Sequence, residues 1–191
     1  MKLVVGLGNF GKEYEKTFHN LGFAAIDRVA EILGFKFSKK KCDAKIAEGN
    51  IGKEKVVLAK PLTYMNLSGI AVKALTDFYK VDFKDLLIIY DDYDLKEGHI
   101  RVRENGSSGT HNGMRNIVET TGRSDFPRVR IGFKPEEEPK IPLIDFVLSR
   151  IPKEKEELFA KSETSAANAA AAFIRGAKIP DIMAEYNGEP R

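Results

Sequence analysis

Short apolar runs alternate along the chain with stretches in which apolar residues recur every three or four positions. The runs have the length of strands, and we expect strands at residues 1–6, 46–51, 56–61, 86–90, 100–103 and 128–133. The periodic stretches predict amphipathic helices that begin near residues 20, 67 and 112, and a long helix over 152–175. Residues 35–45 are basic and are expected to form a loop. This alternation predicts an α/β fold, a single-domain sandwich of a twisted mixed, mainly parallel β-sheet with helices on both faces.

Composition narrows the class of protein. The 191 residues are 42% hydrophobic, contain one cysteine, and include no apolar run long enough to span a membrane. A chain of this length buries a sufficient core without disulfides. We therefore expect a cytoplasmic globular protein with no membrane partner. The net charge of +3 is compatible with a polyanionic partner but does not require one.

A glycine-rich sequence follows the first predicted strand. Gly6, Gly8 and Gly11 match the G-x-G-x-x-G pattern of dinucleotide-binding folds. That pattern needs a helix that begins among the glycines, so that its N-terminal N–H groups hold the pyrophosphate. Here helical periodicity starts only near residue 20. We favour a glycine-rich turn that allows close approach of a ligand, and keep a dinucleotide-binding oxidoreductase as an alternative.

Three loop-to-helix junctions place imidazole or amide side chains just before a helix. They are the sequences FHN at 18–20, YMNLSG at 64–69 and THNG at 110–113. Each is expected at the same edge of the sheet, beside Asp91. Taken singly, Asn66 and Asn112 are better explained as helix N-caps. Together with His19 and Asp91, they form a set suited to hydrolysis of an activated acyl bond by a base-activated water.

The acidic residues after the strand at 86–90 raise the possibility of a metal site. Asp91, Asp92 and Asp94 offer carboxylate ligands for Mg²⁺. No phosphate-binding loop accompanies them, and the three histidines lack zinc-site spacing. We expect a solvated acidic turn at a strand end and no metal.

Arginines gather in the last predicted strands. Arg101 and Arg103 share one face of their strand by the two-residue period, as do Arg128 and Arg130. Such side chains either solvate a sheet edge or, next to the cleft, contact phosphates without regard to sequence.

Five sequence blocks in order resemble one known family. The chain is similar to bacterial-type peptidyl-tRNA hydrolase along essentially its whole length, in the blocks VGLGNFGKEYEKTFHNLG, KPLTYMNLSG, IIYDDYDL, SSGTHNGMRN and RVRIGF. The resemblance implies a monomeric α/β enzyme that needs no cofactor. Its substrate would be peptidyl-tRNA, cleaved at the ester that joins a stalled peptide to the 3′ end of tRNA. Residues 143–191 would form a helical lid and tRNA-facing segment.

The resemblance also implies roles for particular residues. His19 would be the catalytic base and Asp91 the carboxylate that stabilises its active form. Asn9 would distinguish a blocked peptidyl group from a free aminoacyl group. The remaining positions would bind the substrate and position the water, or contact tRNA phosphates in the case of the arginines: Asn66, Asn112, Tyr14, Tyr64, Met65, Arg103 and Arg130.

The chain departs from the family pattern at a few positions. Phe18 stands where an arginine or histidine commonly precedes the catalytic histidine, and Ser107 and Ser108 replace glycines in the loop before His111. A second alternative function also remains at this stage. In a non-catalytic RNA-binding module, only the arginines would matter and the cleft residues would be helix caps.

Overall fold

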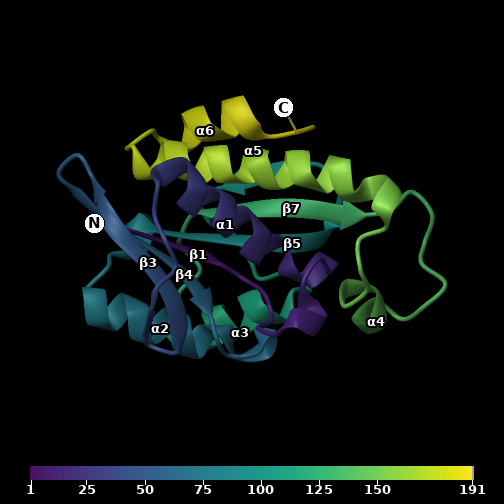
Figure 1. Cartoon of the computed structure of the whole chain (residues 1–191), viewed down its shortest axis with the longest axis horizontal. Helices are drawn as coiled ribbons and strands as arrows, with labels where there is room; N and C mark the ends of the chain where they lie inside the picture. The colour runs from purple at the N-terminus through teal and green to yellow at the C-terminus, as the bar shows by residue number, and fades with distance from the viewer. Residues whose placement is uncertain (191) are drawn as a thin grey trace.

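A seven-stranded sheet runs through the centre of the computed structural model, which describes residues 1–190 (Figure 1). The strand order is β2-β3-β4-β1-β5-β7-β6. The strands are β1 (Lys2–Gly6), β2 (Lys39–Lys41), β3 (Ala44–Ile51), β4 (Glu54–Pro61), β5 (Leu86–Lys96), β6 (Ile100–Arg103) and β7 (Arg128–Lys134). The central strands β4, β1, β5 and β7 are parallel, whereas β2, β3 and β6 add antiparallel pairs towards the two edges. The predicted mixed sheet with a parallel centre is confirmed.

Helices cover both faces of this sheet, as the sequence pattern predicted. They are α1 (Leu21–Leu33), α2 (Ser68–Tyr79), α3 (Asn112–Thr121), α4 (Leu143–Val147), α5 (Glu156–Ile174) and α6 (Ile179–Tyr186). The helices α1, α5 and α6 lie on one face, and α2 and α3 lie on the other (Figure 1). The short helix α4 stands beyond the carboxyl ends of the parallel strands (Figure 1).

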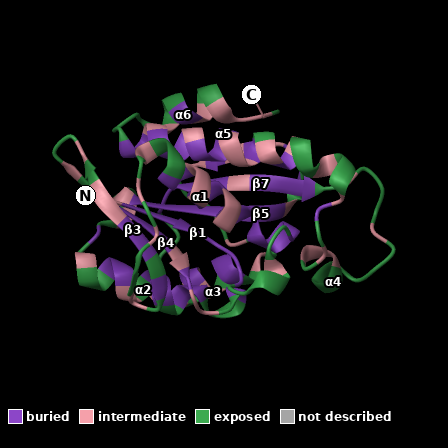
Figure 2. Cartoon of the chain, in the orientation of Figure 1, coloured by how far each residue is buried: buried purple, intermediate pink, exposed green. Residues whose placement is uncertain are grey.

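The core follows the two-residue period of the strands. In β1, Val4 faces α1 and α5, whereas Leu3 and Val5 face α2 and α3, and all three side chains are fully buried. Figure 2 shows the central strands of the sheet mostly in the colour of buried residues. A fully buried aliphatic side chain contributes about 1.5–3 kcal/mol relative to its exposed state. The two hydrophobic layers therefore fix the position of the central strands, and with it the position of the loops at their ends.

Two strand assignments from the sequence need correction. The segment 35–45 is not a loop throughout, because β2 and the start of β3 lie within it. The strand at 86–90 does not end in an acidic turn, because β5 continues to Lys96. Asp91 and Asp92 pair with Ile131 and Gly132 of β7. Strand pairing uses backbone groups, so it continues through polar residues whose side chains find partners.

The glycine-rich sequence after β1 does not open a helix. Two short 3₁₀ turns, Lys12–Tyr14 and Phe18–Asn20, follow it, and α1 begins only at Leu21. The dinucleotide pattern therefore lacks the helix that would hold a pyrophosphate. The glycines instead permit close packing, since a Cβ on Gly6 would lie 2.3 Å from the carbonyl oxygen of Gly22.

Among residues 1–190, no helix is both long enough and apolar enough to cross a membrane.

Replacement of Gly22 by alanine tests the close packing of α1 against the backbone of Leu7 and Ile89. A Cβ there would lie 2.4 Å from the Ile89 oxygen and 2.5 Å from the Leu7 oxygen, both in the backbone. Alanine normally stabilises a helix relative to glycine by about 1 kcal/mol. We expect Gly22→Ala to destabilise the protein instead, by about 1–3 kcal/mol, because the strands must move. Chemical denaturation measures this, with the exposed Glu31→Ala in the same helix as the control. An unchanged or raised stability of Gly22→Ala would contradict the packing described.

Candidate active site

A cleft of about 350 Å³ opens at the carboxyl ends of the parallel strands. One wall consists of polar residues from the loops that precede α1, α2 and α3. The opposite wall consists of apolar residues from α4 and of two aromatic rings from the sheet. The lining residues are Asn9, His19, Tyr64, Met65, Asn66, Asp91, Tyr93, Thr110, His111, Asn112, Phe133, Leu143, Ile144, Val147 and Leu148. A cleft at this edge of a parallel sheet is the usual place for a ligand in an α/β fold.

Two histidines share one buried carboxylate at the centre of the polar wall. His19 Nδ1 lies 2.8 Å from Asp91 Oδ2, and His111 Nε2 lies 3.0 Å from Asp91 Oδ1. Asp91 is only 1% exposed, so its charge is almost removed from water. The predicted contact between His19 and Asp91 is present. His111 is a second partner that the sequence did not assign to the site.

The backbone of α3 fixes which ring nitrogen of the neutral His111 side chain carries the proton. His111 is the N-cap of this helix, and its Nδ1 accepts a hydrogen bond from the backbone N–H of Met114 at 3.1 Å. Since Nδ1 accepts, the proton of the neutral ring lies on Nε2, which donates it to Asp91. The Nδ1–H of His19 donates to the other carboxylate oxygen. His19 Nε2 is left as the nitrogen that can accept a proton.

The charged forms of Asp91 and His19 stabilise each other. Burial disfavours the carboxylate, but the interactions with His19 and His111 outweigh it and hold the pKa of Asp91 well below its usual range. Burial also disfavours a charged His19, yet the charge of Asp91 and the hydrogen bond to it outweigh that effect and raise the pKa of His19 above 6.5. Asp91 therefore stays ionised at neutral pH and makes His19 a stronger base.

Asn9 is held in place so that only its amide nitrogen is available to a ligand. Its Oδ1 accepts a hydrogen bond from the backbone N–H of Met65 at 2.7 Å. Its own backbone N–H donates to Asn20 Oδ1 at 2.8 Å, and its carbonyl accepts from Asn20 Nδ2 at 2.9 Å. Asn20 thus fixes the loop that presents Asn9, and the oriented Nδ2 group is a donor for an acyl oxygen.

Asn66 and Asn112 are not helix caps. The helix α2 has no side-chain cap, and the cap of α3 is His111. Both asparagines are exposed and line the cleft. Capping was the alternative explanation for these residues, and the structure removes it.

Aromatic rings stand at the mouth of the cleft. Tyr64 lines it, is 49% exposed and stacks on Phe10 with ring centres 4.9 Å apart. Tyr14 is not among the lining residues but meets Tyr64 edge-on at 6.5 Å. Met65, next to Tyr64 in the chain, also lines the cleft and is buried. The predicted Tyr14, Tyr64 and Met65 therefore form a continuous group, to which Phe10 belongs as well.

The arginines divide into two kinds. Arg128 is buried and donates to the carbonyl oxygens of Gly106, Ser107 and Ser124, so it organises the loop before α3. Arg130 donates to Asp92 through Nε. Arg103 forms no ion pair with any residue in the described part of the chain.

Arg103 and Arg130 line a separate cavity of about 240 Å³ beside the cleft, together with Asp92, Asp94 and Thr110. Thr110 also lines the cleft. The two arginines therefore adjoin the cleft that His19 lines, but Arg130 is partly neutralised by Asp92.

Comparisons with known proteins show the family of the chain. The family model described as peptidyl-tRNA hydrolase matches residues 3–191. The chain belongs to the peptidyl-tRNA hydrolase family. It is 41% identical to the peptidyl-tRNA hydrolase of Clostridium botulinum strain Hall over 189 residues, which is 98% of this chain and 97% of that protein. It is likewise 41% identical to that of Staphylococcus epidermidis over 190 residues, or 99% of each chain.

A crystal structure of peptidyl-tRNA hydrolase from Acinetobacter baumannii has the same fold. It superposes with a TM-score of 0.91 at 32% identity, covering 100% of this chain and 96% of that one. The chain is therefore an enzyme that hydrolyses the ester between a peptide and tRNA. This function replaces both alternatives, the oxidoreductase and the non-catalytic RNA-binding module.

The three central residues of this hydrolase also resemble a metal-ligand set. One ligand atom from each of His19, Asp91 and His111 lies within 4.8 Å of the others. However, a ring nitrogen that bears a proton cannot coordinate a metal, and the contact of His111 Nδ1 with Met114 places the proton on the nitrogen that faces Asp91. The geometry suits a hydrogen-bonded charge cluster better than a metal centre.

Sequence reasoning missed His111 and the apolar wall of the cleft. His111 was part of a recognised junction, but only the fold shows that Asp91 accepts hydrogen bonds from two sides. Tyr93 and Phe133 alternate with core residues along their strands and gave no separate signal.

Two substitutions at His111 separate its roles in the hydrolase. His111→Ala removes both the cap of α3 and a donor to Asp91, so we expect a loss of about 1–2 kcal/mol of stability and reduced activity. His111→Asn keeps an N-cap side chain but is too short to replace the imidazole at Asp91. We expect it to recover most of the stability and little of the activity. Denaturation and ester-hydrolysis rates measure the two effects. Full activity in His111→Asn would mean that His111 acts only as a cap.

Proposed function

We propose that His19 is the general base that activates water for hydrolysis of the peptidyl-tRNA ester. The observation that supports this most directly is the contact between His19 Nδ1 and Asp91, which leaves Nε2 facing the cleft as a proton acceptor. Asp91 orients the ring and stabilises the imidazolium that forms. His111 positions Asp91 from the other side.

The reaction proceeds in two steps. His19 Nε2 takes a proton from water as the oxygen attacks the ester carbonyl, and the carbonyl becomes an oxyanion. Amide groups of Asn9, Asn66 or Asn112 hold the water and stabilise the oxyanion, where one donor contributes about 3 kcal/mol. When the intermediate collapses, the imidazolium returns its proton to the leaving 3′ oxygen of the tRNA. The products are a peptide with a free carboxylate and a tRNA with a free hydroxyl.

The remaining predicted residues bind the two parts of the substrate. We assign Asn9, Met65, Tyr14 and Tyr64 to the acyl group and the terminal nucleoside, because they form one side of the cleft mouth. We assign Arg103 and Arg130 to tRNA phosphates.

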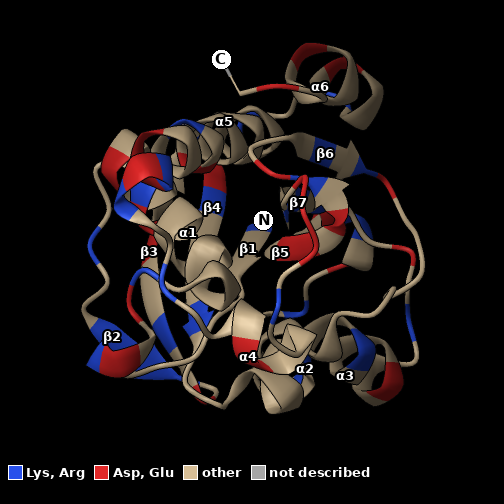
Figure 3. Ribbon diagram, turned by 90° about the vertical axis from the view of Figure 1, so that its right-hand side faces the viewer, with Lys and Arg blue, Asp and Glu red and all other residues tan. Residues whose placement is uncertain are grey.

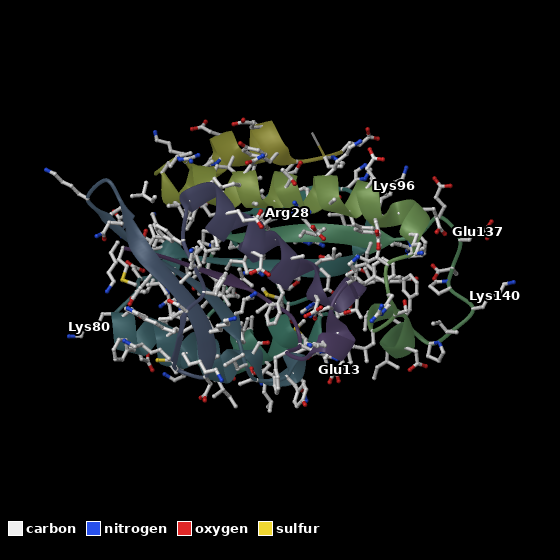
Figure 4. All side chains as sticks on the ribbon, viewed as in Figure 1. Glu13, Arg28, Lys80, Lys96, Glu137 and Lys140 are labelled. Atoms are coloured by element: carbon white, nitrogen blue, oxygen red, sulfur yellow. The ribbon has the colours of Figure 1, made fainter. Side chains whose placement is uncertain are left out.

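The segment 143–191 contains two kinds of structure. The helix α4 supplies apolar side chains to the cleft, and we assign to it the role of a lid over the peptide. The loop before it, which includes Glu137 and Lys140, projects away from the body of the molecule (Figure 4). In contrast, α5 packs on α1 and the sheet, so its buried face is part of the core.

We propose that the enzyme acts as a monomer in the cytoplasm, where tRNA is used. Every residue of the proposed catalytic centre comes from one chain, which supports action without a second copy.

Blocked and free aminoacyl-tRNA distinguish this function from its alternatives. We expect the protein to cleave N-acetyl-aminoacyl-tRNA and to leave aminoacyl-tRNA intact, with EDTA present. His19→Ala should lower kcat by about 100-fold or more and leave tRNA affinity nearly unchanged, because a positioned base contributes at least this much. Release of the acyl group from labelled tRNA measures both. Cleavage that survives loss of His19 would require a different base.

The pH profile tests the pairing of His19 with Asp91. Only unprotonated His19 can accept a proton, so kcat/KM should rise with pH and reach half its maximum above pH 6.5, since the pKa of His19 is raised. Asp91→Asn removes the charge that raises this pKa. The midpoint should then move to lower pH while the maximal rate falls.

Asp94→Asn is the matched control, because Asp94 lies on the same strand and does not contact His19. Its profile should follow that of the unchanged enzyme. A midpoint that stays in place in Asp91→Asn would show that the titrating group is not His19 paired with this carboxylate.

A further inference from the structure

A second cavity adjoins the catalytic cleft on the side away from Arg103. It has a volume of about 540 Å³, and Asn9 lines both it and the cleft. Four lysines line it, against two carboxylates, over a floor that includes the rings of Phe10 and Phe23. The lysines are Lys12, Lys16, Lys45 and Lys60.

Strand register extends this positive charge across the sheet. Lys45 of β3 lies directly opposite Lys40 of β2 on one side and Lys60 of β4 on the other. All three therefore stand on the same face of the sheet. This is the face covered by α1, since Lys60 Nζ reaches Asp27 of α1 at 2.6 Å. In the end-on view, β2 and its lysines lie on one side of the molecule and β6 lies on the other (Figure 3).

Like charges directly opposite each other destabilise a sheet. Lysine on an edge strand has a known benefit, because it prevents edge-to-edge pairing with other chains. That benefit accounts for Lys40 on the edge strand β2 but not for Lys45 or Lys60, which lie on interior strands. The row of lysines is therefore not explained by protection of the fold.

The charges of this cavity are only partly neutralised. Lys60 pairs with Asp27, and Lys16 pairs with Glu156 at 3.3 Å. Within the described residues, Lys12 and Lys45 of the cavity and Lys40 beside it on β2 form no ion pair, and all three are exposed. In the cavity of Arg103, by contrast, Asp92 and Asp94 oppose the arginines.

An exposed aromatic ring connects the cavity to the cleft. Phe10 is 40% exposed, lines the lysine cavity, and stacks on Tyr64, which lines the catalytic cleft. Positive side chains next to exposed rings are characteristic of surfaces that bind single-stranded nucleic acid, where each stacked base contributes about 1–3 kcal/mol.

We propose that this cavity and the adjoining face of β2 form a second tRNA-binding surface, in which Lys12, Lys40 and Lys45 contact backbone phosphates of the substrate and Phe10 stacks on an unpaired base. The proposal rests on the placement of the ester at His19, because the cavity shares Asn9 with that site. It adds a surface on the opposite side of the cleft from Arg103 and Arg130.

The triple variant Lys12→Gln/Lys40→Gln/Lys45→Gln tests the proposal. Each lost contact to single-stranded phosphate lowers the slope of log Kd against log salt by about 0.7, so we expect a decrease of about 2 for uncharged tRNA. KM for N-acetyl-aminoacyl-tRNA should rise about 10-fold at low salt, with kcat unchanged. Loss of like-charge repulsion should leave Tm unchanged or raise it.

Two controls make the outcome specific. Lys53→Gln/Lys80→Gln/Lys178→Gln removes the same charge from exposed positions outside the cavity, and Lys80 lies at the opposite end of the molecule from α4 (Figure 4). The second control is the N-acetyl-aminoacyl ester of adenosine, a substrate without phosphates. The cavity variant should cleave it at the normal rate, and Phe10→Ala should weaken binding of the full tRNA in addition.

Three results would overturn the proposal. They are an unchanged KM and salt slope in the cavity variant, an equal change in the control triple, and an equal loss on the adenosine ester. If the unchanged enzyme failed to cleave N-acetyl-aminoacyl-tRNA, the function itself would fail. That result is separate from any effect of the lysines.

Discussion

The carboxylate of Asp91 is the group around which the site is organised. Removal of an ionised carboxylate from water costs several kcal/mol unless its oxygens receive hydrogen bonds or a counter-charge. Here each oxygen receives one imidazole N–H, from His19 and from His111. The two rings come from loops that follow different strands, so the buried charge links separate parts of the chain. Its burial also strengthens the base, because the same charge raises the pKa of His19.

The packing of the first loop delivers His19 to this carboxylate. Gly6 and Gly22 allow α1 to lie directly against the end of β1 and against Ile89 of β5, at distances that a side chain would prevent. The resulting turn holds Asn9 and Asn20 to each other through two hydrogen bonds. The position of His19 therefore depends on close backbone packing at two glycines and on the contacts between Asn9 and Asn20.

Much of this arrangement was predictable from the sequence. Period-two and helical patterns located most strands and helices, and the same edge-of-sheet argument brought His19, Asp91, Asn66 and Asn112 together. The strand predictions that were wrong depended on pairing with strands distant in the sequence. The strand β5 extends through acidic residues because β7 pairs with it, and β2 forms because β3 lies beside it. Such contacts leave no periodic signal in a polar segment.

The hydrogen-bond partners of individual polar groups could not be predicted from the sequence either. The second donor to Asp91 and the pairing of Arg130 with Asp92 depend on side chains that are close only in the folded chain. The resemblance to a known family supplied residue roles but not these contacts. For the same reason, it gave no indication that Lys45 stands between two other lysines.

The position of α5 along the chain has a consequence during synthesis of the enzyme. During its own synthesis this chain is itself a peptide esterified to tRNA, and so belongs chemically to the class of substrate that it cleaves. The core that faces α1 is completed only by Phe159, Ala166 and their neighbours on α5, which are translated after every strand of the sheet. Until they leave the ribosome, the sheet lacks one covering layer. The order of synthesis thereby delays completion of the core beneath the site until α5 has been made.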